Sequence, residues 1–465
     1  MNSRSKYLFK NLGILTISNF SSKLMVFLLV PLYTSVLSTP EYGTYDLVVS
    51  SVSLLYPLLT VNIVDAVMRF CMDSSSPKNQ VVFIGMKYIC LSIGIIGFML
   101  LGIQCFSIFP SLSGLKVYIF FYYLSYVFNQ FFIQFAKGTE RVKEMGVGGV
   151  LGTVVMIGGN ILFLIVLKRG LLGFFIANIL SQVIPCIYYF YVLKFGDFIG
   201  KRKINKCLEK KMLMYCLPLI FTVLGWWINS AADKYIVTFM CGIAANGLLS
   251  VSYKIPSIIN TVQGIFMQAW QITAIKEYGG KNVALFYGKM FIYINVLMSF
   301  VCSLLIILTK PLAHLLYAND FYSAWLYVPF LLISSVINCA SGFIGPILSA
   351  KKNSKDMALS AIYGALVNIL LNFILIYFIG IQGATIATMI SSFIIYIFRK
   401  ISVKNELLIE SYWKILLTWF LLVIQAIIEV YKSNLFLEII IVGALLLLNY
   451  SVLKDALLMI LKREK

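Results

Sequence analysis

The segment that organises this chain reads KFGDFIGKRKINKCLEKK and occupies residues 194–211. It carries seven Lys and Arg residues and is the longest gap between the apolar runs of the sequence. Six apolar runs of spanning length precede it, and eight follow it. A short, strongly basic loop is expected on the cytoplasmic side of a membrane. We therefore interpret this segment as a cytoplasmic linker between two halves of a membrane protein.

The apolar runs on either side of the linker predict about fourteen transmembrane helices. A helix needs about 20 mainly apolar residues to cross the hydrocarbon core of a bilayer. Runs near that length lie at about 9–37, 44–68, 81–107, 115–136, 145–167, 171–193, 212–240, 245–272, 284–309, 322–349, 357–379, 382–399, 413–431 and 435–458.

The composition of the chain excludes a soluble fold. Hydrophobic residues make up 60% of the sequence, charged residues only 12%, and the mean hydropathy is +0.92. A soluble protein of 465 residues could not bury so much apolar surface. Backbone groups in lipid must be satisfied within their own segment, so the spans are expected to be helices. The sequence therefore predicts an all-α integral membrane protein.

The basic residues predict the orientation of the chain. Thirty of the 38 Lys and Arg residues fall in alternate gaps, on the side where the linker lies, and only five fall in the other gaps. By the positive-inside rule both termini are expected to be cytoplasmic. The apolar run after MNSRSKYLFK is too long for a signal peptide, so we expect it to remain as an anchor. The net charge of +20 is dispersed over short loops and does not indicate nucleic-acid binding.

The two halves show weak internal similarity. The second predicted helix begins EYGTYDLVVSSVSLLYPLL and the eighth begins ANGLLSVSYKIPSIINTVQ. We therefore expect an N-terminal six-helix lobe at 1–193, the linker at 194–211, a C-terminal six-helix lobe at 212–400, and an additional helix pair with a cytoplasmic tail at 401–465. Six helices return the chain to the same side, so a pseudo-twofold axis would lie along the membrane normal.

Small residues predict close contact between two helices. Gly148 and Gly152 are four residues apart in MGVGGVLGTVVMIGGN, so both lie on one face of the fifth predicted helix. The nine cysteines are scattered and include no CxxC pair. We interpret the cysteines as small core residues and expect neither disulfides nor a metal site.

Two lysines lie deep inside predicted spans. A Lys at the centre of a bilayer costs about 2.5–3.5 kcal/mol, so such residues usually face a partner or a water-filled cavity. Lys23 is near the middle of the first helix and shares a face with Asn19 and Ser22. A second polar face on the eighth helix comprises Lys254, Ser257, Thr261, Gly264, Gln268 and Gln271. We expect both faces to line an aqueous cavity.

Two aspartates are candidates for cation coupling. Asp65 lies one helical turn before Arg69 near the inner end of the second helix, and a simple interfacial ion pair is the competing interpretation. Asp233 precedes Lys234 near the outer end of the seventh helix; adjacent residues do not face each other, so Asp233 is expected to reach another helix or to act as an interfacial anchor. Further amides and hydroxyls repeat at helical spacing, at Asn129, Gln130, Gln134, Ser334, Asn338, Asn368 and Asn372.

A positive cavity rich in amides suits an anionic cargo that carries many hydroxyl groups. A sugar linked through pyrophosphate has this chemistry, and lysines act as point charges toward phosphate oxygens.

Two blocks of the sequence resemble a known family. LSTPEYGTYDLVVSSVSLLYPLLTVNIVDAVMRF at 37–70 and AADKYIVTFMCGIAANGLLSVSYKIPSIINTVQGIFMQAW at 231–270 resemble Wzx-type polysaccharide and O-antigen flippases. These belong to the multidrug/oligosaccharidyl-lipid/polysaccharide exporter superfamily. Lys234, Leu249 and Asn62 depart from the family pattern, where Arg, Tyr and Gly are common. The matching positions are Tyr42, Gly43, Tyr45, Arg69, Asp233, Tyr235, Gly242, Gly247 and Tyr253.

The resemblance implies a flippase that moves an undecaprenyl-pyrophosphate-linked oligosaccharide from the inner to the outer leaflet by alternating access. The membrane would be the bacterial cytoplasmic (inner) membrane, and the product an O-antigen, capsule or exopolysaccharide. A polysaccharide polymerase and chain-length proteins would be partners. Lys23, Lys254 and Arg69 would hold phosphate or acidic sugar, with Asn19, Gln268 and Gln271 beside them. Asp65 or Asp233 would couple the cycle to an H⁺ or Na⁺ gradient, and no other cofactor is expected.

Other functions share parts of this pattern. A flippase for the peptidoglycan lipid precursor, or a drug or metabolite antiporter, would have the same two-lobed plan. A polysaccharide polymerase would be expected to carry a sizeable outer loop, and a membrane acyltransferase needs a His within the membrane. The single His, His314, lies in a short outer loop, and no nucleophile elbow, P-loop or metal-spaced cluster occurs. We therefore expect no catalytic residues.

Overall fold

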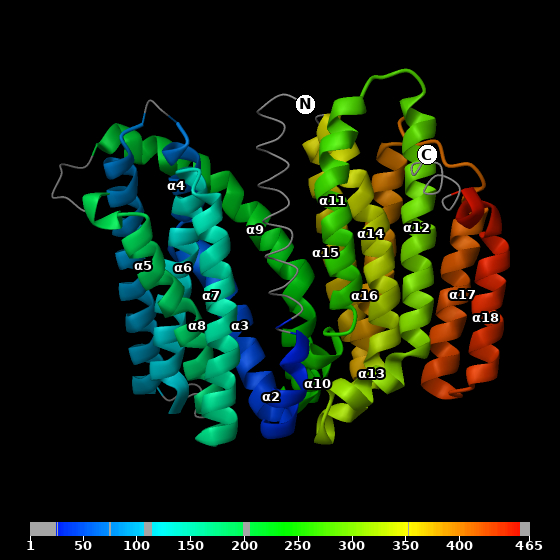
Figure 1. Ribbon diagram of the computed structural model, residues 1–465, viewed down its shortest axis with the longest axis horizontal. Helices are drawn as coiled ribbons and strands as arrows, with labels where there is room; N and C mark the ends of the chain where they lie inside the picture. Colours follow the sequence, from blue (N-terminus) through cyan, green and yellow to red (C-terminus); the bar gives the residue numbers. More distant parts are fainter. Residues whose placement is uncertain are drawn as a thin grey trace. The chain divides into compact units, whose positions relative to one another are not determined.

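The computed structural model describes residue 25 and residues 27–73, 76–106, 114–198, 205–351 and 353–455. Within these ranges the chain forms helices joined by turns, without a β-strand (Figure 1). The prediction of an all-α membrane protein is therefore confirmed.

The chain divides into two compact units, Met1–Trp227 and Ile228–Lys465. The first contains α2 (Val30–Val36), α3 (Thr39–Leu59), α4 (Ile63–Cys71), α5 (Lys78–Phe106), α6 (Lys116–Gly138), α7 (Val142–Asn160), the π-helix η2 (Ile161–Val166), α8 (Gly170–Val192) and the 3-10 helix η3 (Phe195–Phe198). The boundary lies inside α9 (Lys206–Cys241). The second contains α10 (Ile243–Ser252), α11 (Ser257–Glu277), α12 (Val283–Ile307), α13 (Thr309–Leu316), the 3-10 helix η4 (Asn319–Tyr327), α14 (Val328–Ala350), α15 (Ser354–Ile379), α16 (Ile381–Ser402), α17 (Tyr412–Tyr431) and α18 (Leu435–Leu448).

From the second span onward, each predicted span coincides with one helix or with successive helices. The predicted span 245–272 is divided between α10 and α11, and the predicted span 435–458 contains the 14-residue α18. Among the described residues, eight helices are long and apolar enough to cross a membrane, or ten if each of two bent pairs is one span. The bent pairs are α3 with α4 and the two parts of α9. Helices α6 and α11 fill two further predicted spans and are richer in tyrosine or amide side chains. Most of the first predicted span, 9–37, lies outside the described residues.

In the first unit, small residues bring α7 and α8 into close contact, as predicted. A Cβ atom added to Gly152 would lie 2.8 Å from the backbone oxygen of Ser181 on α8, and one added to Gly148 would overlap the ring of Tyr189. The Tyr189 hydroxyl uses this closeness to donate a hydrogen bond to the Met145 carbonyl over 3.0 Å. The glycines therefore carry the contact that aligns these two helices.

The second predicted helix is broken near its C-terminal end. Helices α3 and α4 meet at 62°, and the turn between them holds Val61 and Asn62 at φ of 54° and 52°. Asn tolerates this left-handed region, whereas a β-branched Val is strained there by about 1–3 kcal/mol. The surrounding structure fixes the turn, since the backbone N–H of Asn62 donates to the Pro57 carbonyl over 2.7 Å. The apolar face of α4 is fully buried.

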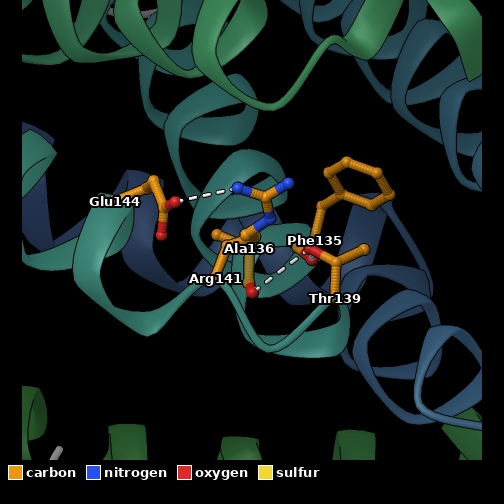
Figure 2. Close-up of polar contacts among 5 residues, drawn as sticks. All are labelled: Phe135, Ala136, Thr139, Arg141 and Glu144. Carbon is orange, nitrogen blue, oxygen red and sulfur yellow. Dashed lines mark hydrogen bonds and ion pairs between the residues drawn. The ribbon is translucent and has the colours of Figure 1, made fainter.

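The turn between α6 and α7 is stabilised by its own residues (Figure 2). The Thr139 hydroxyl donates to the carbonyl of Phe135 over 2.9 Å, so it satisfies an acceptor in the last turn of α6. The Arg141 guanidinium pairs with the Glu144 carboxylate at 3.0 Å in the first turn of α7 (Figure 2). An acidic residue at a helix N-terminus also complements the helix dipole.

Helix α14 forms the centre of the second unit and packs against α11, α12, α16 and α17. In the most apolar stretch of residues 319–350, which include α14, 83% of the residues are buried. Trp270 of α11 stacks on Phe343 of α14 with ring centroids 4.0 Å apart, and its indole N–H donates to the Phe343 carbonyl over 2.8 Å. Helices α15 and α16 pack so closely that a Cβ atom on Gly383 would overlap the backbone of Leu375.

One guanidinium group of the second unit is buried near the end of the helices that the basic residues assign to the cytoplasm. Arg399 of α16 is 7% exposed and donates to the Ser360 hydroxyl of α15 at 3.1 Å and to the Ser341 carbonyl of α14 at 3.0 Å. Side chains on a helix tilt toward its N-terminus, so this group runs deeper into the span instead of toward its inner end. It meets α14 one turn before Pro346, where the proline interrupts the backbone hydrogen bonds.

The connection between α16 and α17 is anchored to the end of α14. The Lys351 ammonium pairs with the Glu406 carboxylate at 2.9 Å and donates to the Ser402 carbonyl at 3.2 Å. The hydrogen bond to Glu406 raises the pKa of Lys351 above its usual value. The connection is therefore fixed at an end that the basic residues assign to the cytoplasm.

Substituting Gly152 by Ala tests the close contact between α7 and α8. The added methyl group would press on backbone that cannot move aside, and overpacking of this kind costs about 1–3 kcal/mol. We expect a lower melting temperature in detergent for Gly152→Ala.

Gly149→Ala is the matched control on the same helix, because no atom lies within 4 Å of a Cβ added there. This variant should be unchanged or slightly more stable, since Ala exceeds Gly in helix propensity by about 0.8–1.0 kcal/mol. Equal melting temperatures for the two variants would contradict the packing described.

Candidate transport site

Asp233 lies at the centre of a polar cluster inside the second unit. Its side chain, on α9, is 4% exposed. One carboxylate oxygen accepts from the Asn372 amide at 2.7 Å. The other accepts from the Thr388 hydroxyl at 2.5 Å and from the Tyr253 hydroxyl at 3.2 Å. Helices α15, α16 and the end of α10 thus all direct a neutral donor at this carboxylate.

The cluster extends away from Asp233 along α15 and α16. The Asn372 amide also donates to the side-chain oxygen of Asn368 at 3.1 Å, one turn earlier on α15. Asn368 in turn reaches the Ser391 hydroxyl of α16 at 3.5 Å. Ser392 of α16 lies 3.0 Å from Ser334 of α14. The polar spacing seen in the sequence therefore becomes a network that joins three packed helices.

The Asp233 carboxylate is held by neutral groups. Among the described residues, no ion pair to Asp233 is found, and its neighbour Lys234 points from a different side of the helix. The oxygen of the Asn372 side chain is buried without a hydrogen-bond partner in the described part of the chain. A buried carboxylate beside an unpaired amide oxygen provides oxygen ligands for a small cation or a place for a proton.

Lys254 lies at a break between two helices. Helix α10 ends at Ser252 and α11 begins at Ser257, and Pro256 lies between them. The Lys254 side chain is half-buried. Its carbonyl accepts from the Ser257 hydroxyl at 2.5 Å, so the turn is closed by its own residues. The preceding residue, Tyr253, donates a hydrogen bond to Asp233, so Lys254 is next in the sequence to a member of the Asp233 cluster.

Two residues of the predicted polar face, Gln268 and Gln271, lie on the exposed side of α11. Gln268 and Gln271 are exposed on the second unit, whereas Trp270 and Ala274 of the same helix are buried in its core. The face continues to Thr261, whose hydroxyl donates to its own helix at Ser257 over 2.8 Å. That this face lines a cavity stays a prediction.

The first unit holds Asp65 and Arg69, and the structure does not pair them. The Asp65 carboxylate accepts hydrogen bonds from two side-chain amides, that of Asn62 at 2.9 Å and that of Gln134 on α6 at 2.8 Å. Arg69 is exposed in the last turn of α4. Asp65 therefore serves the bend between α3 and α4. Lys23 and Asn19 lie outside the described residues.

Sequence reasoning identified Asp233 but only part of its surroundings. The spacing of Asn368 and Asn372 was visible, because four residues make one helical turn. Thr388 and Tyr253 reach Asp233 from other helices, and only the family resemblance singled out Tyr253. A signal for Thr388 exists in the polar residues of α16, which recur as Thr385, Thr388, Ser391 and Ser392.

Among the described residues, no group of three or more His, Cys, Asp or Glu side chains could hold a metal ion. The residues provide hydrogen bonds, one buried carboxylate and cations near the ends of helices.

Solved structures with similar folds are transporters. An inward-facing multidrug resistance MATE family transporter of the MOP superfamily matches with a TM-score of 0.63 and 16% identity, over 84% of this chain and 98% of its own. The lipid II flippase MurJ in an inward closed conformation matches with a TM-score of 0.64 and 16% identity, over 96% of this chain and 99% of its own. At this identity the likeness establishes the fold and leaves the cargo open.

One of two sequence comparisons identifies a family. No curated protein matches the sequence significantly. A family model described as polysaccharide biosynthesis protein matches residues 8–271, which is more than half of the chain. The chain therefore belongs to the polysaccharide biosynthesis protein family and is a multi-pass membrane protein with the fold of MOP superfamily transporters.

Proposed function

We propose that the protein is a flippase for a polyprenyl-pyrophosphate-linked oligosaccharide. It moves this lipid from the inner to the outer leaflet of the bacterial cytoplasmic membrane by alternating access, with both termini in the cytoplasm. The product enters an O-antigen, capsule or exopolysaccharide. The observation that carries this proposal is the combination of a polysaccharide biosynthesis family with a transporter fold.

The fold comparison supports a lipid-linked cargo. One similar structure is that of a flippase for lipid II, and it covers nearly the whole of this chain. Family membership favours polysaccharide precursors over drugs and metabolites. A polysaccharide polymerase and chain-length proteins would then be the partners that receive the product.

Cationic and amide side chains would bind the cargo. Lys254 is half-buried at a helix break, where a lysine can serve as a point charge toward phosphate oxygens. Lys23 and Arg69 would add charge from the N-terminal half. Amides suit sugar hydroxyls, because each amide donates and accepts hydrogen bonds. Asn19, Gln268 and Gln271 would fill this role.

Asp233 would couple transport to a cation gradient. It is more deeply buried than Asp65, and its donors come from three helices, so occupancy by H⁺ or Na⁺ would change how those helices hold together. Asp65 is the weaker candidate, since its two amide partners already serve a fixed bend.

Replacing Lys254 by Ala tests the cargo site. A hydrogen bond to a charged group contributes about 1.5–3 kcal/mol, so cargo affinity should fall by about tenfold or more. We expect less surface polysaccharide and an accumulation of the lipid-linked precursor. Lys23→Ala should act in the same direction.

Lys276→Ala is the matched control, because Lys276 is exposed in the last turn of α11, the helix that follows Lys254. It should leave polymer levels unchanged. Normal polymer at normal expression in both Lys23→Ala and Lys254→Ala would remove the proposed role of these lysines. Rescue of a strain that lacks its lipid II flippase would redirect the cargo assignment to the peptidoglycan precursor.

Replacing Asp233 by Asn tests cation coupling. Asn keeps the shape of the side chain but loses its charge, so the variant should fold and fail to respond to the cation. In the wild type, we expect the melting temperature to rise with Na⁺ at constant ionic strength, or with acidification if the cation is H⁺. Polysaccharide export should fall in Asp233→Asn.

Asp65→Asn provides the comparison within the first unit and should keep the cation response. If Asp233→Asn exports normally and responds to Na⁺ and pH as the wild type does, Asp233 is not the coupling residue.

A further inference from the structure

The guanidinium of Arg399 is a buried cation without a carboxylate partner. Its side chain is 7% exposed, and among the described residues no ion pair joins it to Asp or Glu. A guanidinium stays charged in proteins. Charged side chains inside spanning segments usually pair with each other or mark the path of a ligand or ion. Arg399 therefore carries a charge that the protein around it does not neutralise.

The hydrogen bonds of Arg399 use only part of its guanidinium group. Nε donates to the Ser360 hydroxyl at 3.1 Å. Nη1 donates to the Ser341 carbonyl at 3.0 Å and to the Ser341 hydroxyl at 3.4 Å. A guanidinium presents five N–H donors in a planar fork. Among the described residues, Nη2 has no acceptor, so its donors remain for another group.

Two neutral donors belong to the same part of α14. The Ser341 hydroxyl accepts from Arg399, and its own hydrogen has no acceptor in the described part of the chain. The half-buried Gln263 of α11 reaches α14 at the next residue, because a Cβ atom added to Gly342 would lie 3.0 Å from its amide nitrogen. Hydroxyl and amide donors of this kind complete the binding of an anion that a guanidinium attracts.

The neighbouring cations are engaged elsewhere or exposed. Lys351 pairs with Glu406 at 2.9 Å, and the Lys400 ammonium lies over the ring of Tyr412. Lys404 is exposed in the connection that follows α16. An anion that enters between α14 and α16 would therefore bind to Arg399.

The depth of the site selects the kind of anion. Ser341 lies nine residues before the end of α14 at Ala350, which is about 13 Å along a helix that rises about 1.5 Å per residue. Ser360 lies six residues after the start of α15 at Ser354, or about 9 Å along it. The headgroups of a bilayer lie outside its hydrocarbon core. The site therefore suits a phosphate that is carried into the protein better than a headgroup in its usual position.

We propose that Arg399, together with the Ser341 hydroxyl, binds a phosphate group of the lipid-linked cargo after it enters from the inner leaflet. A guanidinium matches phosphate in geometry, and charge-assisted hydrogen bonds are about twice as strong as neutral ones. Binding through Nη2 leaves the contacts with Ser360 and the Ser341 carbonyl intact, so α14, α15 and α16 stay joined while the site is filled. The proposed function supplies only the identity of the phosphate.

The test measures lipid binding by native mass spectrometry of the full-length protein, with undecaprenyl pyrophosphate as the probe. The parent protein carries Lys23→Ala and Lys254→Ala, so that the lysines proposed above do not contribute. Arg399→Gln removes the charge, and the affinity for the probe should fall at least about tenfold. Ser341→Ala keeps the carbonyl contact with Arg399 but loses one donor, so affinity should fall about threefold to tenfold.

Two variants are matched controls. Ser335, also on α14, is buried and donates to the Leu331 carbonyl of its own helix at 3.0 Å. Ser335→Ala and the exposed Lys404→Ala should both bind the probe as the parent does. Because Arg399 joins three helices, Ser341→Ala decides the test if Arg399→Gln does not fold. Equal affinity of the parent and Ser341→Ala would overturn the proposal, and so would a parent that does not bind the probe.

Phosphatidylglycerol serves as the second probe, because bilayer lipids carry the same phosphate chemistry. Undecaprenyl pyrophosphate should bind more tightly, and that preference should be lost in Arg399→Gln and reduced in Ser341→Ala. Tighter binding of phosphatidylglycerol that depends on Ser341 would assign the site to a bilayer lipid and overturn the cargo assignment.

Failure of this inference is distinguishable from failure of the proposed function, because binding is measured without transport. Probe binding that depends on Ser341, in a protein that exports no polysaccharide, would support the site and remove the flippase. Normal export together with equal binding by the parent and Ser341→Ala would support the flippase and remove the site.

Discussion

The carboxylate of Asp233 has to be satisfied inside a bundle of apolar helices, and the second unit is built around that requirement. In lipid an unpaired polar group costs several kcal/mol, so its partners must come from the protein. Asn372, Thr388 and Tyr253 meet the requirement from three different helices. Because α15 and α16 approach so closely at Gly383, their polar side chains can reach the same carboxylate.

The same constraint explains the other unusual groups. Arg399 is satisfied by serines and a carbonyl of neighbouring helices, and the buried Glu429 carboxylate has the Lys310 ammonium 4.0 Å away. Each solution uses residues far apart in the sequence. Polar groups thus specify which helices pack together, whereas apolar contacts between lipid-surrounded helices discriminate less between partners.

The spans could be predicted from the sequence because hydropathy reports directly on the solvent around each helix. The break at Val61 and Asn62 could not, since neither position is a glycine or a proline. A charged residue inside an apolar run also stands out in the sequence, and Asp233 is a candidate for that reason. The hydrogen-bond partners of Asp233 could not be predicted, because hydrogen bonds between helices depend on how the helices rotate against each other. Glu429 and Glu438 look like ordinary residues of a helix end until their burial is known.

The guanidinium of Arg399 has a consequence for movement. It joins α14, α15 and α16 through hydrogen bonds close to Pro346, where the backbone hydrogen bonds of α14 are interrupted. Separating these helices would strand a charge in hydrocarbon, which is costly. The three helices are therefore expected to travel as one rigid body during the transport cycle.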